Sequence, residues 1–598
     1  MTTDTTPRQQ GIIPLQEKTA RALVAIGGAA TAVSTFLAWT WTSEFPGDLT
    51  VTGYPGGLQV LALVGALLTV LFTAASYGVR GLRWLNPAGT DSPLLLLTLG
   101  VFGVVWYTVA SITVELNGAV NLEPGAYVAA AASLVALVGA LGLPIRGDSG
   151  DLTAPANAWE TFRRAIAAAP PRKPARTLPS WAELLLIVVA FGIGLYVFTY
   201  GIDTAYAELF VGFLIIVAFG FAALTKSGLI ARLTTITTKH RNVTIAAAFT
   251  AAAGFPFTQN NDAYTSVGVN ILVFATVALG LNVVVGLAGL LDLGYVAFLG
   301  VGAYTAALVS GSTSSALGIQ FPFWAAALAG AAASLVFGVL IGAPTLRLRG
   351  DYLAIVTLGF GEIFRITMNN LNGTTGPDIT NGPNGISNVP DLDMFGFNFG
   401  ESHETGINSL GRFGNYYLLM LLFTAIVVIV FRRAGESRIG RAWVAIREDE
   451  TAATAMGING FRLKLMAFAL GASLAGLAGA VQAHVTYSVT PDQFEFAGTA
   501  PPNSAFLLAA VILGGMGTVS GPLIGASLLY LIPVKLQFMH DYQLLLFGLA
   551  LILLMRFRPE GLVVNRRSKL EYHETDQLAV PKQLTLADAN VDSSKAGA

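Results

Sequence analysis

Apolar runs of about 20 residues recur along the whole chain, and they constrain its fold more than any other feature. A helix of that length crosses the hydrocarbon core of a bilayer. Of the 598 residues only 12% are charged and 54% are hydrophobic, against about 25% charged in an ordinary soluble domain. The runs are rich in Gly, Ala and Leu and lack the alternation of a membrane barrel. The sequence therefore predicts an all-α, polytopic integral membrane helix bundle with about 14–16 spans.

Several classes of function are disfavoured by what the sequence contains. A net charge of -1 predicts no nucleic-acid partner, and the absence of cysteine excludes disulfides, thiolate metal sites and cysteine nucleophiles. The sequence has no G-x-x-x-x-G-K-[ST] phosphate loop, so we expect ATP and magnesium to be bound by other subunits and no cofactor or metal by this chain. The histidines are scattered without metal-ligand spacing: His240, His403, His484, His540 and His573. We expect a transport subunit with no catalytic residues.

Positive charge orients the chain, because Lys and Arg concentrate in cytoplasmic loops. Basic residues gather before the first run, at Arg80 and Arg83 after the second, and in the Pro-rich segment 146–179. Arg556 and Arg558 follow the last run. This pattern predicts a multi-pass protein of the cell (plasma) membrane, surrounded by lipid, with both termini in the cytoplasm.

The stretch 504–534 is too long and too rich in glycine to be a single span. If they crossed once, the basic residues after the last run would lie on the outer side, against the charge rule. Interruption at Gly514, Gly515 and Gly517 divides the stretch in two and restores a cytoplasmic tail. Non-helical backbone is tolerated at membrane depth only where protein or a water-filled cavity covers it. We therefore predict a broken or re-entrant helix beside a translocation path, with a glycine-rich contact between tightly packed helices as the alternative.

A second glycine-rich stretch, GLNVVVGLAGLLDLGYVAFLGVGAY, surrounds an ionisable residue, Asp292. Gly286, Gly289 and Gly294 allow close approach of neighbouring backbones, and plain helix packing accounts for them equally well. A carboxylate within an apolar run is costly and often functional. Asp292 and these glycines are thus candidates for the path or its gate, and Asp292 has the alternative of capping a helix at the cytoplasmic interface.

Glu362 and Arg365 form another candidate for the translocation path. They lie three residues apart, on one face of the helix predicted over 352–370, and are close enough to pair. At about 1.5 Å per residue, Glu362 lies more than halfway across from Tyr352. Such a pair would face the bundle interior or an aqueous cavity rather than lipid. It could be a structural ion pair or contact a substrate.

Signature segments between residues 243 and 563 resemble, in the same order, the LivM-type permease subunits of branched-chain amino acid ABC importers. They are the glycine-rich stretch quoted above, PTLRLRGDYLAIVTLGFGEIFRI, NGPNGIS, GRAWVAIREDETAATAMGI, VILGGMGTVSGP and RPEGL. The resemblance implies import of Leu, Ile and Val by alternating access. It also implies a homologous second permease subunit, two cytoplasmic ABC ATPases and an extracytoplasmic solute-binding protein as partners.

The segment 440–457 would be the contact with an ATPase if the resemblance holds. Its candidate coupling residues are Arg441, Glu448, Asp449, Glu450, Ala452, Ala453 and Gly457. The Ala-Ala-x-x-x-Gly spacing of ABC importers is kept, but Thr451 occupies the position of the usual glutamate, which makes Glu450 its nearest substitute. Alanines permit close docking of a short helix, and a glycine ends it with a turn.

The resemblance covers only part of the chain and leaves alternatives open. A permease for urea or short amides would carry similar segments, and an ion-coupled secondary transporter would need more intramembrane acidic residues than are present. We predict these parts: an accessory membrane domain of about four spans (1–145), a Pro/Arg-rich cytoplasmic linker (146–180), two additional spans with a basic loop (181–242), the permease domain (243–563) and a disordered cytoplasmic tail (564–598).

Overall fold

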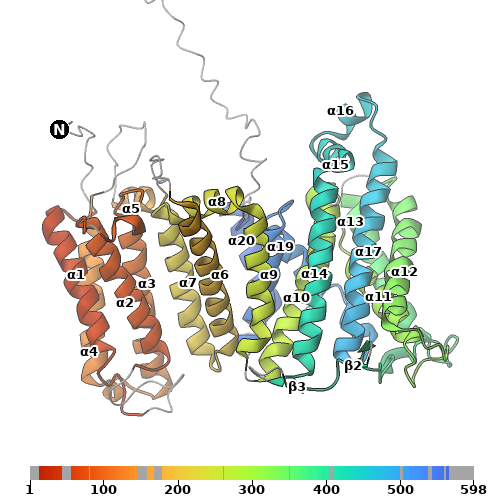
Figure 1. Ribbon diagram of the computed structural model, residues 1–598, viewed down its shortest axis with the longest axis horizontal. Helices are drawn as coiled ribbons and strands as arrows, with labels where there is room; N and C mark the ends of the chain where they lie inside the picture. Colours follow the sequence, from red (N-terminus) through yellow and green to blue (C-terminus); the bar gives the residue numbers. More distant parts are fainter. Residues whose placement is uncertain are drawn as a thin grey trace, which may run out of the picture.

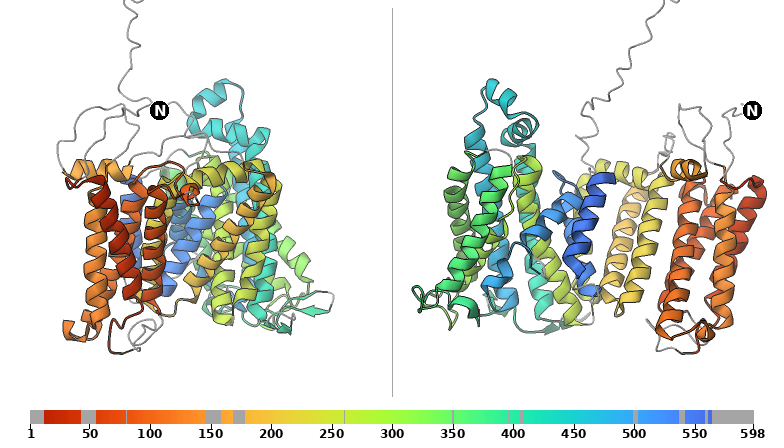
Figure 2. Two further views of the ribbon diagram at one scale, coloured as in Figure 1. Left: turned by 60° about the vertical axis from the view of Figure 1, so that its left-hand side comes forward. Right: turned by 180° about the vertical axis from the view of Figure 1, so that it is seen from behind.

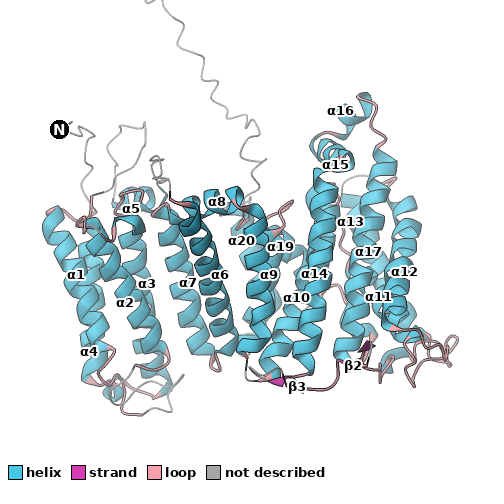
Figure 3. Cartoon of the chain, in the orientation of Figure 1, coloured by secondary structure: helices cyan, strands magenta, loops and turns pink. Residues whose placement is uncertain are grey.

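The computed structural model describes a helical protein. The described residues are 12–42, 55–79, 81–144, 158–167, 178–259, 261–348, 351–394, 396–404, 409–498, 503–536, 542–557 and 561–563. Long helices run side by side through them (Figure 1), and strands are confined to short segments at one end (Figure 3). The predicted all-α class is confirmed. The tail 564–598 and most of the linker 146–180 lie outside the described residues.

Nine of the described helices are long and apolar enough to cross a membrane. They are α2 (Leu58–Ser76), α3 (Ser92–Glu115), α4 (Pro124–Leu141), α6 (Ser180–Asp203), α7 (Ala207–Lys226), α10 with the π-helical η3 (Asp262–Leu287), α12 (Phe323–Thr345), α14 (Arg412–Glu436) and α17 (Gly460–Thr486). Beside them lie α1 (Glu17–Ser34), α9 (Arg241–Thr258), α11 (Val296–Val309), α13 (Asp351–Asn370), α18 (Ser504–Gly514), α19 (Ser520–Lys535) and α20 (Gln543–Phe557). Together they form the polytopic bundle that the apolar runs predict.

Helices α1 to α4 form a bundle of their own at one end of the molecule (Figure 2). Gly27 of α1 packs directly on the backbone of α4, and Gly139 of α4 packs on that of α1. Arg21 of α1 pairs with Asp91, which precedes α3, at 3.2 Å. This bundle packs through α3 on α7, so α6 to α9 lie between it and the rest of the chain.

One lysine joins the additional helices to the C-terminal half. Lys535, at the end of α19, donates to the backbone carbonyls of Ile202 and Thr204 at the end of α6. Its ammonium also lies 4.8 Å from the centre of the Tyr264 ring in α10. Cations are favourable at helix C-termini, so this contact stabilises α6 against the core.

The core of the C-terminal half consists of α10, α11, α12, α14 and α17. Gly302 of α11 meets Gly476 of α17 and Gly330 of α12 at backbone distance, and Ser334 of α12 donates to the carbonyl of Phe298 at 2.9 Å. Because apolar side chains gain nothing by leaving lipid, such close backbone packing is a main source of cohesion in membranes. These contacts join α11, α12 and α17, and α17 in turn packs on α10.

The remaining elements lie near the two ends of the long helices. The helices α5 (Ala158–Ala167), α8 (Leu229–Lys239), α15 (Arg438–Glu448) and α16 (Glu450–Ala455) lie at the end where α1 begins and α20 finishes (Figure 1). The opposite end carries the hairpins β1 (Asp393–Met394) with β2 (Phe397–Asn398) and β3 (His403–Glu404) with β4 (Ser409–Leu410). Short turns are η1 (Arg83–Leu85), η2 (Ala119–Asn121), η4 (Gly382–Asn384) and η5 (Pro491–Phe494).

The end with the hairpins is held by one arginine. Arg412, the first residue of α14, pairs with Asp391 at 3.0 Å and donates to the carbonyls of His484 and Val485 at the end of α17. Its guanidinium lies 3.5 Å from the centre of the Tyr487 ring. The segment that carries the hairpins is thereby fixed to the end of α17.

Candidate functional site

The predicted coupling segment forms two short helices that project beyond the spans (Figure 1). The first, α15, is anchored on α17 by Trp443, which is buried and donates from its indole nitrogen to the carbonyl of Leu463 at 2.8 Å. Arg441 is exposed on α15 and donates to the carbonyl of Glu436 at 3.2 Å. The segment is therefore a folded projection with a fixed base.

The second helix, α16, is defined by a cap at each end. Asp449 accepts from the backbone nitrogens of Thr451 and Ala452 at 2.8 and 2.9 Å, which caps its start. At its end Gly457 has φ +85° and Ile458 N–H donates to the carbonyl of Ala453 at 3.0 Å, a Schellman ending. The glycine turn predicted from the sequence is present. Ala452 and Gly457 are exposed, whereas Ala453 is buried.

The acidic residues of the segment are paired within the chain. Glu450 lies 2.7 Å from the ammonium of Lys464, a residue of α17 whose side chain is only 9% exposed. Glu448 accepts from its neighbour Arg447 at 2.6 Å. Glu450 thus connects α16 to α17. Its place beside the usual glutamate of the importer motif did not predict this contact.

Arg447 connects α15 to the glycine-rich stretch after α10. Its Nη1 donates to the carbonyl of Gly286 in η3 at 2.9 Å. Gly289 has φ +70°, and any side chain there would collide with Arg447. Both glycines therefore contact Arg447 of α15 directly.

Asn282 links the same stretch to the break between α18 and α19. The break is present, since α18 ends at Gly514, Gly515 has φ +118° and α19 begins at Ser520. The buried amide of Asn282 accepts from the backbone nitrogen of Gly517 at 2.8 Å and donates to the carbonyl of Thr518 at 2.7 Å. It satisfies backbone groups that a continuous helix would have paired internally.

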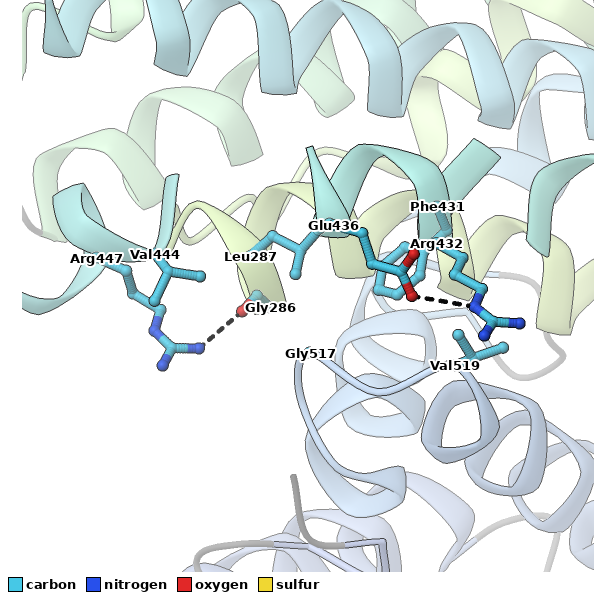
Figure 4. A pocket seen from close by; sticks show the side chains of 10 residues that line it. Gly286, Leu287, Phe431, Arg432, Glu436, Val444, Arg447, Gly517 and Val519 are labelled. Atoms are coloured by element: carbon cyan, nitrogen blue, oxygen red, sulfur yellow. Dashed lines mark hydrogen bonds and ion pairs between the residues drawn. The ribbon is translucent and has the colours of Figure 1, made fainter. Parts of the chain in front are cut away.

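A pocket of about 250 Å³ lies where these elements meet (Figure 4). At one side Arg447 reaches Gly286, and at the other Arg432 pairs with Glu436 at 3.2 Å. The pocket is lined by Gly286, Leu287, Phe431, Arg432, Gly435, Glu436, Val444, Arg447, Gly517 and Val519. Residues of α14, α15, η3 and the break between α18 and α19 thus line one pocket at the end of the spans.

Asp292 lies away from this pocket, in the turn before α11. It is 1% exposed, and its Oδ1 accepts from Gly294 N–H at 3.0 Å. The alternative that Asp292 caps a helix is wrong for α11, which begins at Val296 after Tyr295 with no side-chain cap. Gly294 packs on the carbonyl of Thr357, so this turn is seated on α13.

Glu362 and Arg365 pair on α13, as their spacing predicts. Arg365 donates to the two carboxylate oxygens of Glu362 at 2.9 and 3.3 Å and lies 3.9 Å from Asp492 in η5. The pair is not among the residues that line the pocket.

The structure brings Gly286, Gly289 and Gly517 together with the base of the segment 440–457, whereas the lining of the pocket does not include Asp292, Glu362 or Arg365. The functional roles of all these residues stay predictions. Sequence reasoning did not single out Asn282, Arg447 and Lys464. A lone amide inside the apolar run GLNVVVGL was the signal available for Asn282.

Known proteins resemble the C-terminal half of the chain. Residues 263–555 match the family described as branched-chain amino acid transport system / permease component. The high-affinity branched-chain amino acid transport system permease protein LivM of Salmonella typhimurium is 40% identical over 332 residues, which are 54% of this chain and 74% of that protein. LivM of Escherichia coli K12 is 41% identical over 312 residues, 50% of this chain and 70% of that protein.

A more distant similarity links the chain to a second kind of permease. The high-affinity branched-chain amino acid transport system permease protein LivH of Escherichia coli K12 is 30% identical over 129 residues, 21% of this chain and 40% of that protein. No solved structure matches the chain. Helices α1 to α9 precede the matched family region altogether.

Proposed function

The chain belongs to the branched-chain amino acid transport system permease family, and from this membership we propose that it is one membrane subunit of an ATP-driven importer for leucine, isoleucine and valine. A second, homologous permease completes the membrane part. Two cytoplasmic ATPases supply the chemical energy, and an extracytoplasmic binding protein delivers the amino acid.

The contact between α15 and the turns at the end of the spans carries this proposal. A partner that moves α15 also moves Arg447, whose guanidinium holds the carbonyl of Gly286. One helical turn before Gly286, Asn282 holds the backbone of Gly517 and Thr518. A displacement at the projecting helices is thereby transmitted to the broken helix through hydrogen bonds. Alternating access requires an element with two arrangements, and this connection would couple such an element to the projecting helices.

Charge supports an orientation with α15 and α16 in the cytoplasm. The basic residues Arg432, Arg433 and Arg438 lie where α14 meets α15, at the end of the spans shared with the start of α1. The opposite end carries the acidic residues Asp393, Glu401 and Glu404 around the hairpins. Because Lys and Arg concentrate in cytoplasmic loops, this excess supports a cytoplasmic position for the first end. The hairpin end would then meet the binding protein.

The coupling assignment is tested in the reconstituted complex with Glu450→Gln and Gly457→Ala combined. The first change leaves the buried Lys464 unpaired, and the second strains the end of α16. We expect less amino acid transported per ATP hydrolysed. Glu115→Gln, exposed at the end of α3, is the matched control and should keep the wild-type ratio. An unchanged ratio in the double variant would refute the assignment of α16 as the ATPase contact.

A further inference from the structure

Helix α13 differs from the other long helices of the C-terminal half. Its 20 residues are enough to cross a membrane, yet it is not among the nine described helices that are apolar enough to do so. Counting about 1.5 Å per residue, the helix is about 30 Å long and Glu362 lies about 16 Å from its start. The Glu362–Arg365 pair therefore lies near the middle of α13, which corresponds to mid-depth if the helix spans the bilayer.

This central ion pair is not enclosed within the chain. The side chain of Glu362 is 43% exposed and that of Arg365 is 25% exposed. Ile363, beside Glu362, is 64% exposed, and Ile355 and Ile366 continue the same exposed stripe along α13. A charged pair at mid-depth is costly against lipid and is found where protein or water covers it.

The neighbouring helix α12 shows what a lipid-facing surface of this chain looks like. Its exposed residues Leu328, Val336 and Leu340 are apolar, and its sequence contains no Asp, Glu, Lys or Arg. Exposed apolar residues alone therefore do not distinguish α13 from a lipid-facing helix such as α12. The ion pair within the exposed stripe does.

We propose that the stripe from Ile355 to Ile366 on α13 is the surface that packs against the second permease subunit, an inference that rests on the function proposed above. Gly359 lies in this stripe, and no atom approaches within 4 Å of where its Cβ would be. Small residues at such a position let a partner helix come close. Glu362 and Arg365 are each partly exposed, and their paired charges are available to complementary polar groups of that partner.

The arrangement of the other helices agrees with this choice of surface. The bundle of α1 to α4 and the helices α6 to α9 occupy the other end of the molecule (Figure 2), and α6 is fastened to α19 through Lys535. The partner permease is similar in build if it resembles LivH, to which part of this chain is 30% identical. Its packing on α13 would place the Glu362–Arg365 pair at the boundary between the subunits, where a shared path would run.

The absence of cysteine makes the test clean, because one introduced thiol is the only one in this chain. Ile363→Cys and the control Leu328→Cys of α12, 68% exposed, are each labelled with a photoactivatable maleimide in the complete complex in vesicles. We expect Ile363→Cys to cross-link to a cysteine-free second permease at least ten times more than Leu328→Cys does. Ile355→Cys is the second position on the same stripe, used if Ile363→Cys does not assemble.

ATP-driven uptake by each labelled complex before illumination separates the two claims. Cross-linking from α13 with retained uptake supports the surface. Equal and low cross-linking from α13 and α12 in a complex that still takes up leucine would overturn the surface and leave the proposed function intact. If the unsubstituted complex assembles but shows no ATP-driven uptake, the proposed function is wrong.

Discussion

Replacement of Asn282 by leucine should loosen the break between α18 and α19. Leucine has the same number and branching of side-chain heavy atoms as asparagine but can neither accept from the Gly517 N–H nor donate to the Thr518 carbonyl. Leaving a buried backbone group unsatisfied costs about 1–3 kcal/mol. Loss of both hydrogen bonds should therefore make the arrangement of residues 515–519 seen in the structure less stable by about 2–6 kcal/mol.

Hydrogen–deuterium exchange of the peptide around Gly517 measures this loss directly. Local opening governs the exchange of a protected amide. Since about 1.4 kcal/mol corresponds to a factor of ten, the lower bound of 2 kcal/mol predicts exchange at least about 30 times faster. The matched control is Asn270→Leu on the same helix, because the Asn270 amide donates only one turn back, to the carbonyl of Ser266. Exchange near Gly517 that is equally fast in the two variants would refute the role of Asn282.

Three further substitutions test the coupling segment. Arg447→Lys keeps the charge but loses the guanidinium fork that bonds Gly286 and Glu448 at once, so this contact should weaken by about 1 kcal/mol and uptake per ATP should fall. Arg433→Lys at the exposed end of α14 is the control and should not change uptake per ATP; equal effects of the two variants would contradict the contact. Glu450→Gln should lower the thermal stability of the chain more than Lys464→Met, because only Glu450→Gln leaves a buried ammonium without its partner. Since Glu450 is 41% exposed, the loss of stability should stay below the about 3–5 kcal/mol of a fully buried pair. A larger loss in Lys464→Met than in Glu450→Gln would be inconsistent with the pairing. Gly457→Ala should lower the free energy of unfolding by about 1–2 kcal/mol through the positive φ of this position alone, because nothing lies within 4 Å of the added methyl group. Gly457→Asn should lower it less, since asparagine tolerates positive φ better; equal shifts of the melting temperature would argue against a strained turn.

Local patterns in the sequence predicted the features that depend on neighbours along the chain. The pairing of Glu362 with Arg365 follows from a spacing of three residues on a helix. The turn at Gly457 follows from a glycine after a short alanine-rich helix. The break at Gly514 to Gly517 followed from glycine content together with the side on which the basic tail must lie. In each case the cause lies within a few residues.

Contacts between distant segments could not be predicted in the same way. Asn282 and Gly517 are separated by 235 residues, and Gly286 and Arg447 by 161. Nothing in the hydropathy of either segment specifies that they meet, because their contact depends on how α10 packs on α14 and α19. The burial of Lys464 depends likewise on where α16 folds back on α17. The contact of Lys535 with the end of α6, which precedes the matched family region, likewise joins segments far apart in the sequence.

The central claim is that ATP hydrolysis by partner subunits drives amino acid import through this chain. It is tested most directly in vesicles that contain this chain, the second permease and the two ATPases, with the binding protein and labelled leucine outside and ATP inside. The account predicts accumulation of leucine that requires ATP, this chain and the binding protein, and that persists when ion gradients are collapsed. Uptake driven by a proton or sodium gradient without ATP, or ATP-driven uptake of urea but not of leucine, isoleucine or valine, would contradict it.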